Sequence, residues 1–166
     1  MKKLLKPIFA ILLLASIVSS CTKDSSTNNS TSSSASGGTS YKVDGGSTIT
    51  VDSTNAVLYT NFATKVRTID VYAFKAGKQV LEFHFLPKTG NQVVYNAQGA
   101  TASLSFLENQ TASFDAQSGS FNLTVCDTIG KKIVGTFGFV GKLYPYTANT
   151  AHTISEGKLS VTKLTK

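Results

Sequence analysis

The sequence predicts an all-β protein, with one antiparallel domain built as a meander-type β-sandwich or a flattened β-barrel. Three observations favour this class. Apolar and polar residues alternate with a period of two from residue 41 onward, and no stretch of about a dozen residues shows helical periodicity. Turn sequences separate the alternating segments by roughly 8 to 12 residues, a spacing typical of such folds. The short connections favour pairing between neighbours in the sequence.

Four segments show the alternation most clearly: residues 66–74, 79–85, 119–127 and 157–164. Glycine and asparagine between the segments, as in "DGG" at Asp44, supply the positive φ angles that tight hairpins need. Residues 41–166 are therefore expected to form one domain, long enough to bury about two-thirds of its unfolded surface. The apolar positions expected to face its core are Ile69, Val71, Ala73, Leu81, Phe83, Phe85, Phe121, Leu123, Val125, Leu159 and Val161.

The segment "KIVGTFGFVG", residues 132–141, is partly apolar on both faces of the predicted strand. Ile133, Phe137 and Phe139 share one face, whereas Val134 and Val140 share the other. This pattern favours a central strand packed on both sides, with glycines that allow close approach or a bend. The alternative is that the glycines line a ligand cavity.

The first 20 residues have the layout of a secretory signal peptide. Lys2, Lys3 and Lys6 form a charged segment, residues 7–18 read "PIFAILLLASIV", and two small residues follow. The apolar segment is too short for a transmembrane helix, which needs about 20 residues. A retained membrane span is therefore the weaker alternative.

The stretch "VSSC", residues 18–21, resembles the lipobox of bacterial lipoproteins, in which an aliphatic and two small residues precede a cysteine. The resemblance implies that Cys21 becomes the first mature residue, with a diacylglycerol on its sulfur and an acyl chain on its amine. Two or more acyl chains hold a protein stably on a membrane. The alternative is an ordinary cleaved signal followed by an unrelated cysteine.

Residues 21–40 are expected to form the lipidated cysteine and a flexible tether. The tether contains Ser, Thr, Asn and Gly with single Lys, Asp and Ala residues, so burial of apolar surface cannot offset the entropy of ordering it. We therefore expect an outer-membrane lipoprotein, held on the membrane by its lipid, whose domain faces the periplasm or the cell surface.

Charge and cysteine content exclude further classes. The chain has 16 Lys and Arg against 9 Asp and Glu, so loss of Lys2, Lys3 and Lys6 with the signal lowers the formal charge from +7 to +4. The remaining basic residues form no stripe, which argues against a nucleic-acid partner. Lipidation of Cys21 leaves Cys126 without a disulfide partner in the chain, so the fold must depend on its apolar core.

Three short motifs lie in the C-terminal half of the chain: "SGSFNLTV" at 118–125, "VGTFGFVG" at 134–141 and "ISEGKLSV" at 154–161. A fourth, "YKVDGG" at 41–46, precedes them. Together they resemble a family of small, functionally uncharacterised lipoproteins from Bacteroidota. Leu159 stands where that family's pattern has an aromatic residue. The resemblance implies an extracytoplasmic β-domain and brings no reaction with it.

The sequence offers few groups for catalysis. Its two histidines are His84 and His152, and Glu82 shares a predicted strand face with His84, where two solvated side chains are a better explanation than an acid–base pair. Asp127 should raise the pKa of the neighbouring Cys126 thiol, which argues against a nucleophile. No metal-ligand or phosphate-binding spacing occurs. We therefore expect no catalytic residue, metal site or cofactor, and no enzymatic activity.

The segment "KLYPYTANTAH", residues 142–152, is the predicted contact surface, with Tyr144, Tyr146 and His152 as its candidate residues. In the alternative, the tyrosines only cap the end of the domain. "DST" at 52–54 and "DTI" at 127–129 resemble the motif at which Bacteroidota O-glycosylate exported proteins. Ser53 and Thr128 are therefore candidate glycan acceptors, with plain turn residues as the alternative.

Three functions remain after these exclusions. The first is a lipid-anchored, non-catalytic β-domain of the cell envelope that binds a glycan or an envelope protein, or helps to build an assembly. The second is a lipocalin-like carrier with an interior cavity, suggested by the apolar residues on both faces of residues 132–141. The third is a hydrolase.

Overall fold

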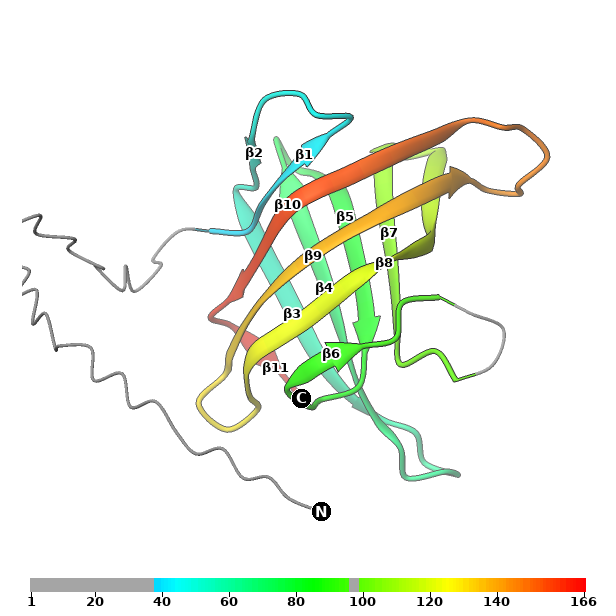
Figure 1. Ribbon diagram of the computed structural model, residues 1–166. Helices are drawn as coiled ribbons and strands as arrows, with labels where there is room; N and C mark the ends of the chain where they lie inside the picture. Colours follow the sequence, from blue (N-terminus) through cyan, green and yellow to red (C-terminus); the bar gives the residue numbers. More distant parts are fainter. Residues whose placement is uncertain (1–37, 96–98) are drawn as a thin grey trace, which may run out of the picture. The chain divides into compact units, whose positions relative to one another are not determined.

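The computed structural model describes residues 38–95 and 99–166 (Figure 1). The predicted signal peptide, Cys21 and most of the predicted tether lie outside these residues. No helix that could cross a membrane occurs in the described part. The strands are β1 (Ser40–Val43), β2 (Ile49–Thr50), β3 (Ser53–Thr60), β4 (Arg67–Lys75), β5 (Lys78–Phe85), β6 (Gly90–Gln92), β7 (Ala102–Asn109), β8 (Ala112–Asp127), β9 (Lys132–Leu143), β10 (Ala151–Val161) and β11 (Leu164–Thr165).

All these strands belong to one curled sheet, which confirms the predicted all-β domain of the flattened-barrel or sandwich type. The strand order is β11-β3-β4-β5-β7-β8-β9-β10-β1-β2, with β6 beside β8, so the chain follows an antiparallel meander from β3 to β10. The parallel pairing of β11 with β3 departs from the expected pattern. Figure 1 shows β8, β9 and β10 curling across in front of β3, β4 and β5.

The interior between the two sides of the sheet is filled by aromatic side chains. Phe83 on β5 lies 4.9 Å from Phe137 on β9 and 5.8 Å from Phe121 on β8, measured between ring centroids. Phe85 lies 5.1 Å from the same Phe121 ring. The predicted core positions are buried, apart from Val125, and they join further buried residues such as Tyr41 and Phe114 in one cluster.

A bulge in β8 explains why Val125 departs from the prediction. Leu123 is opposite Gly135, but Val125 is already opposite Val134, so Thr124 is an extra residue in β8. The extra residue exchanges the faces of everything that follows it. The strict alternation of residues 119–127 predicts Cys126 on the polar face of the strand, and this prediction is wrong, because Cys126 packs against the core.

Strand β9 is buried on one face only. Ile133, Phe137 and Phe139 point into the core, whereas Val140 on the opposite face is exposed, so the expectation of packing on both faces is wrong. The glycines nevertheless allow close approach, as expected. A Cβ atom on Gly135 would lie 2.5 Å from the carbonyl oxygen of Asn122, next to the bulge in β8.

Candidate ligand-binding surface

A row of polar side chains crosses the outer face of four strands. Tyr72 on β4 is opposite Glu82 on β5, Glu82 is opposite Ser105 on β7, and Ser105 is opposite Asp115 on β8. Opposite residues in antiparallel strands place their Cβ atoms about 4.5–5.5 Å apart, so these side chains form one surface. Their neighbours along the strands, Val71, Phe83, Leu104 and Phe114, are buried, which places the row on the side away from the core.

Asp115 is held in place by three hydroxyl groups. Its Oδ1 atom accepts hydrogen bonds from Ser105 Oγ at 2.9 Å and from Ser113 Oγ at 2.8 Å. Its Oδ2 atom accepts a hydrogen bond from the Tyr146 hydroxyl at 2.7 Å. Charge-assisted bonds of this kind are stronger than bonds between neutral groups. The carboxylate is therefore fixed on the surface before any ligand arrives.

The hydrogen bond to Asp115 also fixes the protonation state of Tyr146. Chiefly because the phenol donates to this carboxylate, and in addition because of desolvation, the pKa of Tyr146 rises to about 12. A tyrosine is a neutral donor at physiological pH in any case, and the raised pKa extends this state further into the alkaline range. Its ring keeps one orientation while 47% of its surface stays exposed.

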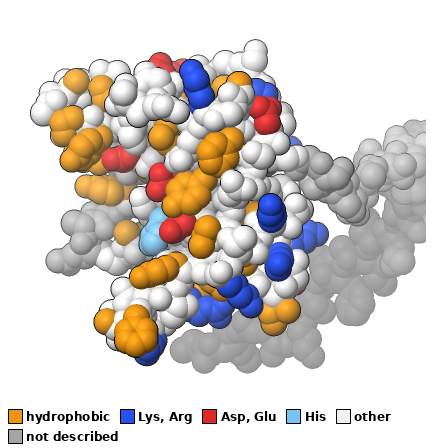
Figure 2. Space-filling view, turned by 180° about the vertical axis from the view of Figure 1, so that it is seen from behind, with side chains coloured by type: hydrophobic (Ala, Val, Ile, Leu, Met, Phe, Trp, Pro, Cys, Tyr) orange, Lys and Arg blue, Asp and Glu red, His pale blue; other side chains and the backbone are white. Residues whose placement is uncertain are grey.

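Two tyrosines form the walls of a pocket over this row. The pocket has a volume of about 460 Å³, and its lining includes Glu82, Tyr95, Ser105, Asp115 and Tyr146. Tyr95 and Tyr146 are similarly exposed, at 48% and 47%. We call the row and these two rings the tyrosine–carboxylate face. Figure 2, seen from behind, shows acidic and hydrophobic side chains on the left half of the molecule, whereas most Lys and Arg side chains lie on the right and at the lower end.

Glu82 and His84 share the outer face of β5, as predicted, and they contact different side chains: Glu82 accepts a hydrogen bond from Gln79 Nε2 at 3.0 Å. The Nδ1 atom of His84 contacts Asp70 Oδ1, and Ser103 on β7 is the residue opposite His84. Aspartate, histidine and serine occur in this order in hydrolytic triads. A hydrolase also needs donors for the oxyanion. The backbone N–H groups of β5 lie in the plane of the sheet, toward β4 and β7, so they cannot serve above this row.

The structure separates the three predicted contact residues. Tyr144 and Tyr146 lie together, with ring centroids 5.5 Å apart and planes at 87°. His152 lies on the other side of β8, because its ring packs against buried Phe114 at 4.4 Å. Its Nδ1 atom lies 2.6 Å from Asp44 Oδ2, which ties the start of β10 to the turn between β1 and β2. His152 is therefore not part of the tyrosine–carboxylate face.

Both candidate glycan acceptors lie at strand ends or turns, as expected. Ser53 is exposed at the start of β3. Thr128 is half-buried in the turn between β8 and β9, where Asp127 Oδ1 accepts hydrogen bonds from the backbone N–H groups of Ile129 and Gly130. Their modification remains a prediction.

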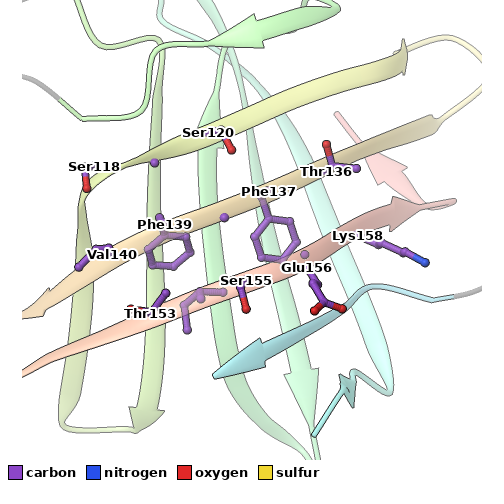
Figure 3. Close-up of a pocket in the computed structure, with 14 residues that line it drawn as sticks. Ser118, Ser120, Thr136, Phe137, Phe139, Val140, Thr153, Ser155, Glu156 and Lys158 are labelled. Atoms are coloured by element: carbon purple, nitrogen blue, oxygen red, sulfur yellow. The ribbon is translucent and has the colours of Figure 1, made fainter. Parts of the chain in front are cut away.

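The outer face of β8, β9 and β10 carries a second, larger groove with a volume of about 710 Å³ (Figure 3). Small and hydroxyl-bearing residues line it, among them Ser118, Ser120 and Thr136. Of the two charged side chains at its rim, Glu156 is already paired with Lys42 at 2.8 Å. The two phenylalanines in its lining, Phe137 and Phe139, are buried, so this groove offers no exposed aromatic wall, and we place the candidate site on the tyrosine–carboxylate face.

The predicted contact surface at residues 142–152 did not include Tyr95, Ser105 or Asp115. Asp115 and Tyr146 are 31 residues apart and meet only through the register of the strands. The available signal was the outward position of Asp115 in the alternating stretch "ASFDAQS", and a strand alignment would have been needed to use it.

In the described ranges, no group of three or more His, Cys, Asp and Glu side chains could hold a metal ion. Comparison with protein-family models, with curated proteins and with solved structures finds no match to this chain.

Proposed function

We propose that the protein is a lipid-anchored, non-catalytic binding domain of the bacterial outer membrane, and that its tyrosine–carboxylate face binds a glycan. The observation that carries this proposal is the carboxylate of Asp115, fixed by three hydroxyl donors beside the exposed rings of Tyr95 and Tyr146.

A sugar presents hydroxyl donors around its edge and C–H groups on its faces. The hydroxyl groups fit carboxylate acceptors such as Asp115 and Glu82, and the C–H faces fit the exposed tyrosine rings. Because Asp115 and Tyr146 are already fixed by hydrogen bonds, little side-chain entropy is lost on binding. A preformed pocket with a few convergent polar groups is the usual form of a small-molecule site.

The packed interior favours this function over a carrier with an interior cavity. The rings of Phe83, Phe85, Phe121 and Phe137 occupy the space that a lipocalin-like ligand would need. The row of Asp70, His84 and Ser103 is a weaker basis for a hydrolase, because the backbone N–H groups of β5 lie in the plane of the sheet and do not point at an oxyanion above it.

The anchoring part of the proposal is supported by the sequence. The lipobox-like "VSSC" supplies the acylated residue, and the residues after it supply a tether to the domain. The resemblance to Bacteroidota lipoproteins supports the same location. Labelling of cells with radioactive palmitate tests this part: the wild-type protein should take up label, and Cys21→Ala should not. Label retained by the variant would contradict acylation at Cys21.

The binding part is tested by intrinsic fluorescence, because the chain has 6 Tyr and no Trp. We would titrate the mature chain, with Cys21→Ser for solubility, with a panel of neutral and acidic oligosaccharides. Tyr146→Ala should weaken binding at least tenfold, because it removes one ring of the pocket lining and the hydrogen bond that holds Asp115 Oδ2. Tyr146→Phe keeps the ring and should weaken binding less.

Tyr59→Ala is the matched control, since Tyr59 is an exposed tyrosine on β3 outside the pocket lining. It should leave affinity unchanged. Equal losses of affinity in Tyr59→Ala and Tyr146→Ala would contradict glycan binding at the tyrosine–carboxylate face. Absence of binding to every glycan in the panel would contradict it as well.

A further inference from the structure

The two most exposed large hydrophobic side chains in the described part of the chain lie at tips of hairpins. Phe62, between β3 and β4, is 86% exposed, and Ile129, between β8 and β9, is 87% exposed. The Lys65 ammonium lies 4.2 Å from the centre of the Phe62 ring. A single exposed apolar residue needs no explanation of its own, so the place and the surroundings of these two side chains decide what they can do.

Both tips project from the same end of the sheet. The last pair of β3 and β4 is Thr60 with Arg67, and the last pair of β8 and β9 is Asp127 with Lys132. Because the strands between them alternate in direction, both turns leave at one end, which is the lower end in Figure 1. The connection after β5 leaves there too. We call residues 61–67, 86–89 and 127–132 the basic loop end.

This end carries the excess charge of the domain. The described residues include twelve Lys and Arg and eight Asp and Glu. Five of the basic residues and one acidic residue, Asp127, belong to the basic loop end, which leaves seven of each sign elsewhere. The basic side chains are those of Lys65, Arg67, Lys88, Lys131 and Lys132. In Figure 2, blue and orange side chains meet at the lower end of the molecule.

We propose that the basic loop end docks on an anionic lipid surface. Phe62 and Ile129 enter the headgroup region, and the five basic side chains face lipid phosphates. Basic residues near an anionic leaflet and apolar side chains at the interface each favour such binding. This docking rests on the proposed acylation of Cys21, which keeps the domain close to a membrane, and the charge and the exposed tips of the basic loop end decide which end faces the lipid. The surface itself binds without the lipid anchor, so the two are tested separately.

The test uses the full mature chain with Cys21→Ser, which lacks the acyl chains. It is sedimented with large vesicles of pure phosphatidylcholine and with vesicles that contain phosphatidylglycerol as well. The chain should bind the anionic vesicles, bind the neutral ones at least tenfold less, and dissociate as salt rises. Phe62→Ser should lower partitioning about tenfold, and Lys132→Glu should lower it at least fivefold.

Two variants at the opposite end of the sheet are the matched controls. Tyr144→Ser removes an exposed aromatic ring from the connection between β9 and β10, and Lys78→Glu reverses a charge at the start of β5. Both should leave partitioning nearly unchanged. The proposal would be overturned if the variants at the two ends lowered partitioning by equal factors. It would also be overturned if the chain did not bind anionic vesicles. A wild-type chain that dimerises in solution and becomes monomeric with Phe62→Ser would overturn it in favour of a second copy as the partner.

Discussion

The substitution Phe83→Ala tests whether the interior is solid. Phe83 is 0% exposed, and its ring joins the two sides of the sheet through Phe121 at 5.8 Å and Phe137 at 4.9 Å. Truncation of a buried Phe to Ala costs about 3–5 kcal/mol, because transfer energy is lost and a cavity remains. The two aromatic contacts place the expected loss in the upper part of that range.

The loss is large relative to the stability of a domain, which is about 5–15 kcal/mol. Urea unfolding of the mature chain with Cys21→Ser, followed by circular dichroism, measures the change in the free energy of unfolding. Phe62→Ala is the control: Phe62 is exposed, so its removal should change the free energy of unfolding by less than about 0.5 kcal/mol.

A second variant keeps the test decisive if Phe83→Ala does not fold. Phe83→Leu keeps most of the buried volume and should cost about 1–2 kcal/mol. A loss below about 1.5 kcal/mol in Phe83→Ala would contradict a filled interior, because it would mean that the ring borders open space. A carrier function would then return as the better proposal.

Three further predictions concern individual ionisable groups. The pKa of Asp44 is lowered, chiefly because its carboxylate accepts a hydrogen bond from the backbone N–H of Thr153. Asp44 therefore stabilises the fold above its unfolded pKa of about 3.9, and this stabilisation is lost as pH falls through the folded pKa. Asp44→Asn should lower the urea midpoint at pH 7, and the difference in midpoint between variant and wild type should shrink in acid. Asp115→Asn should lower the pKa of Tyr146 from about 12 toward its ordinary value of about 10, as measured by NMR titration of the ring carbons; an unchanged pKa would contradict the assigned cause. Burial is the main cause that raises the pKa of the Cys126 thiol, so a thiol reagent should modify it slowly in the folded chain and rapidly in urea, whereas equal rates would contradict its packing against the core.

Much of the fold followed from the alternation of residue types, because a strand with one buried face needs an apolar residue at every second position. Ile69, Val71 and Phe83 show how well this rule places the core. It failed after Thr124, since a bulge leaves no mark in the composition and exchanges the faces of the residues that follow. The parallel pairing of β11 also depends on contacts distant in sequence.

The candidate site was predictable only in part. Tyr146 stood out as an aromatic residue in a polar loop, and the structure places it at the pocket. Its partner Asp115 is on another strand, and His152, which the same loop suggested, is drawn to the opposite side of β8 by Asp44 and Phe114. Strand register, which the sequence does not encode locally, decides which of these groups meet.

The central claim is that a glycan binds the tyrosine–carboxylate face. NMR chemical-shift mapping of the isotope-labelled mature chain during titration with an oligosaccharide that binds tests it most directly. We expect the largest shifts on Tyr95, Ser105, Asp115 and Tyr146. Shifts centred instead on the groove of β8, β9 and β10, around Ser120 and Thr136, would contradict it.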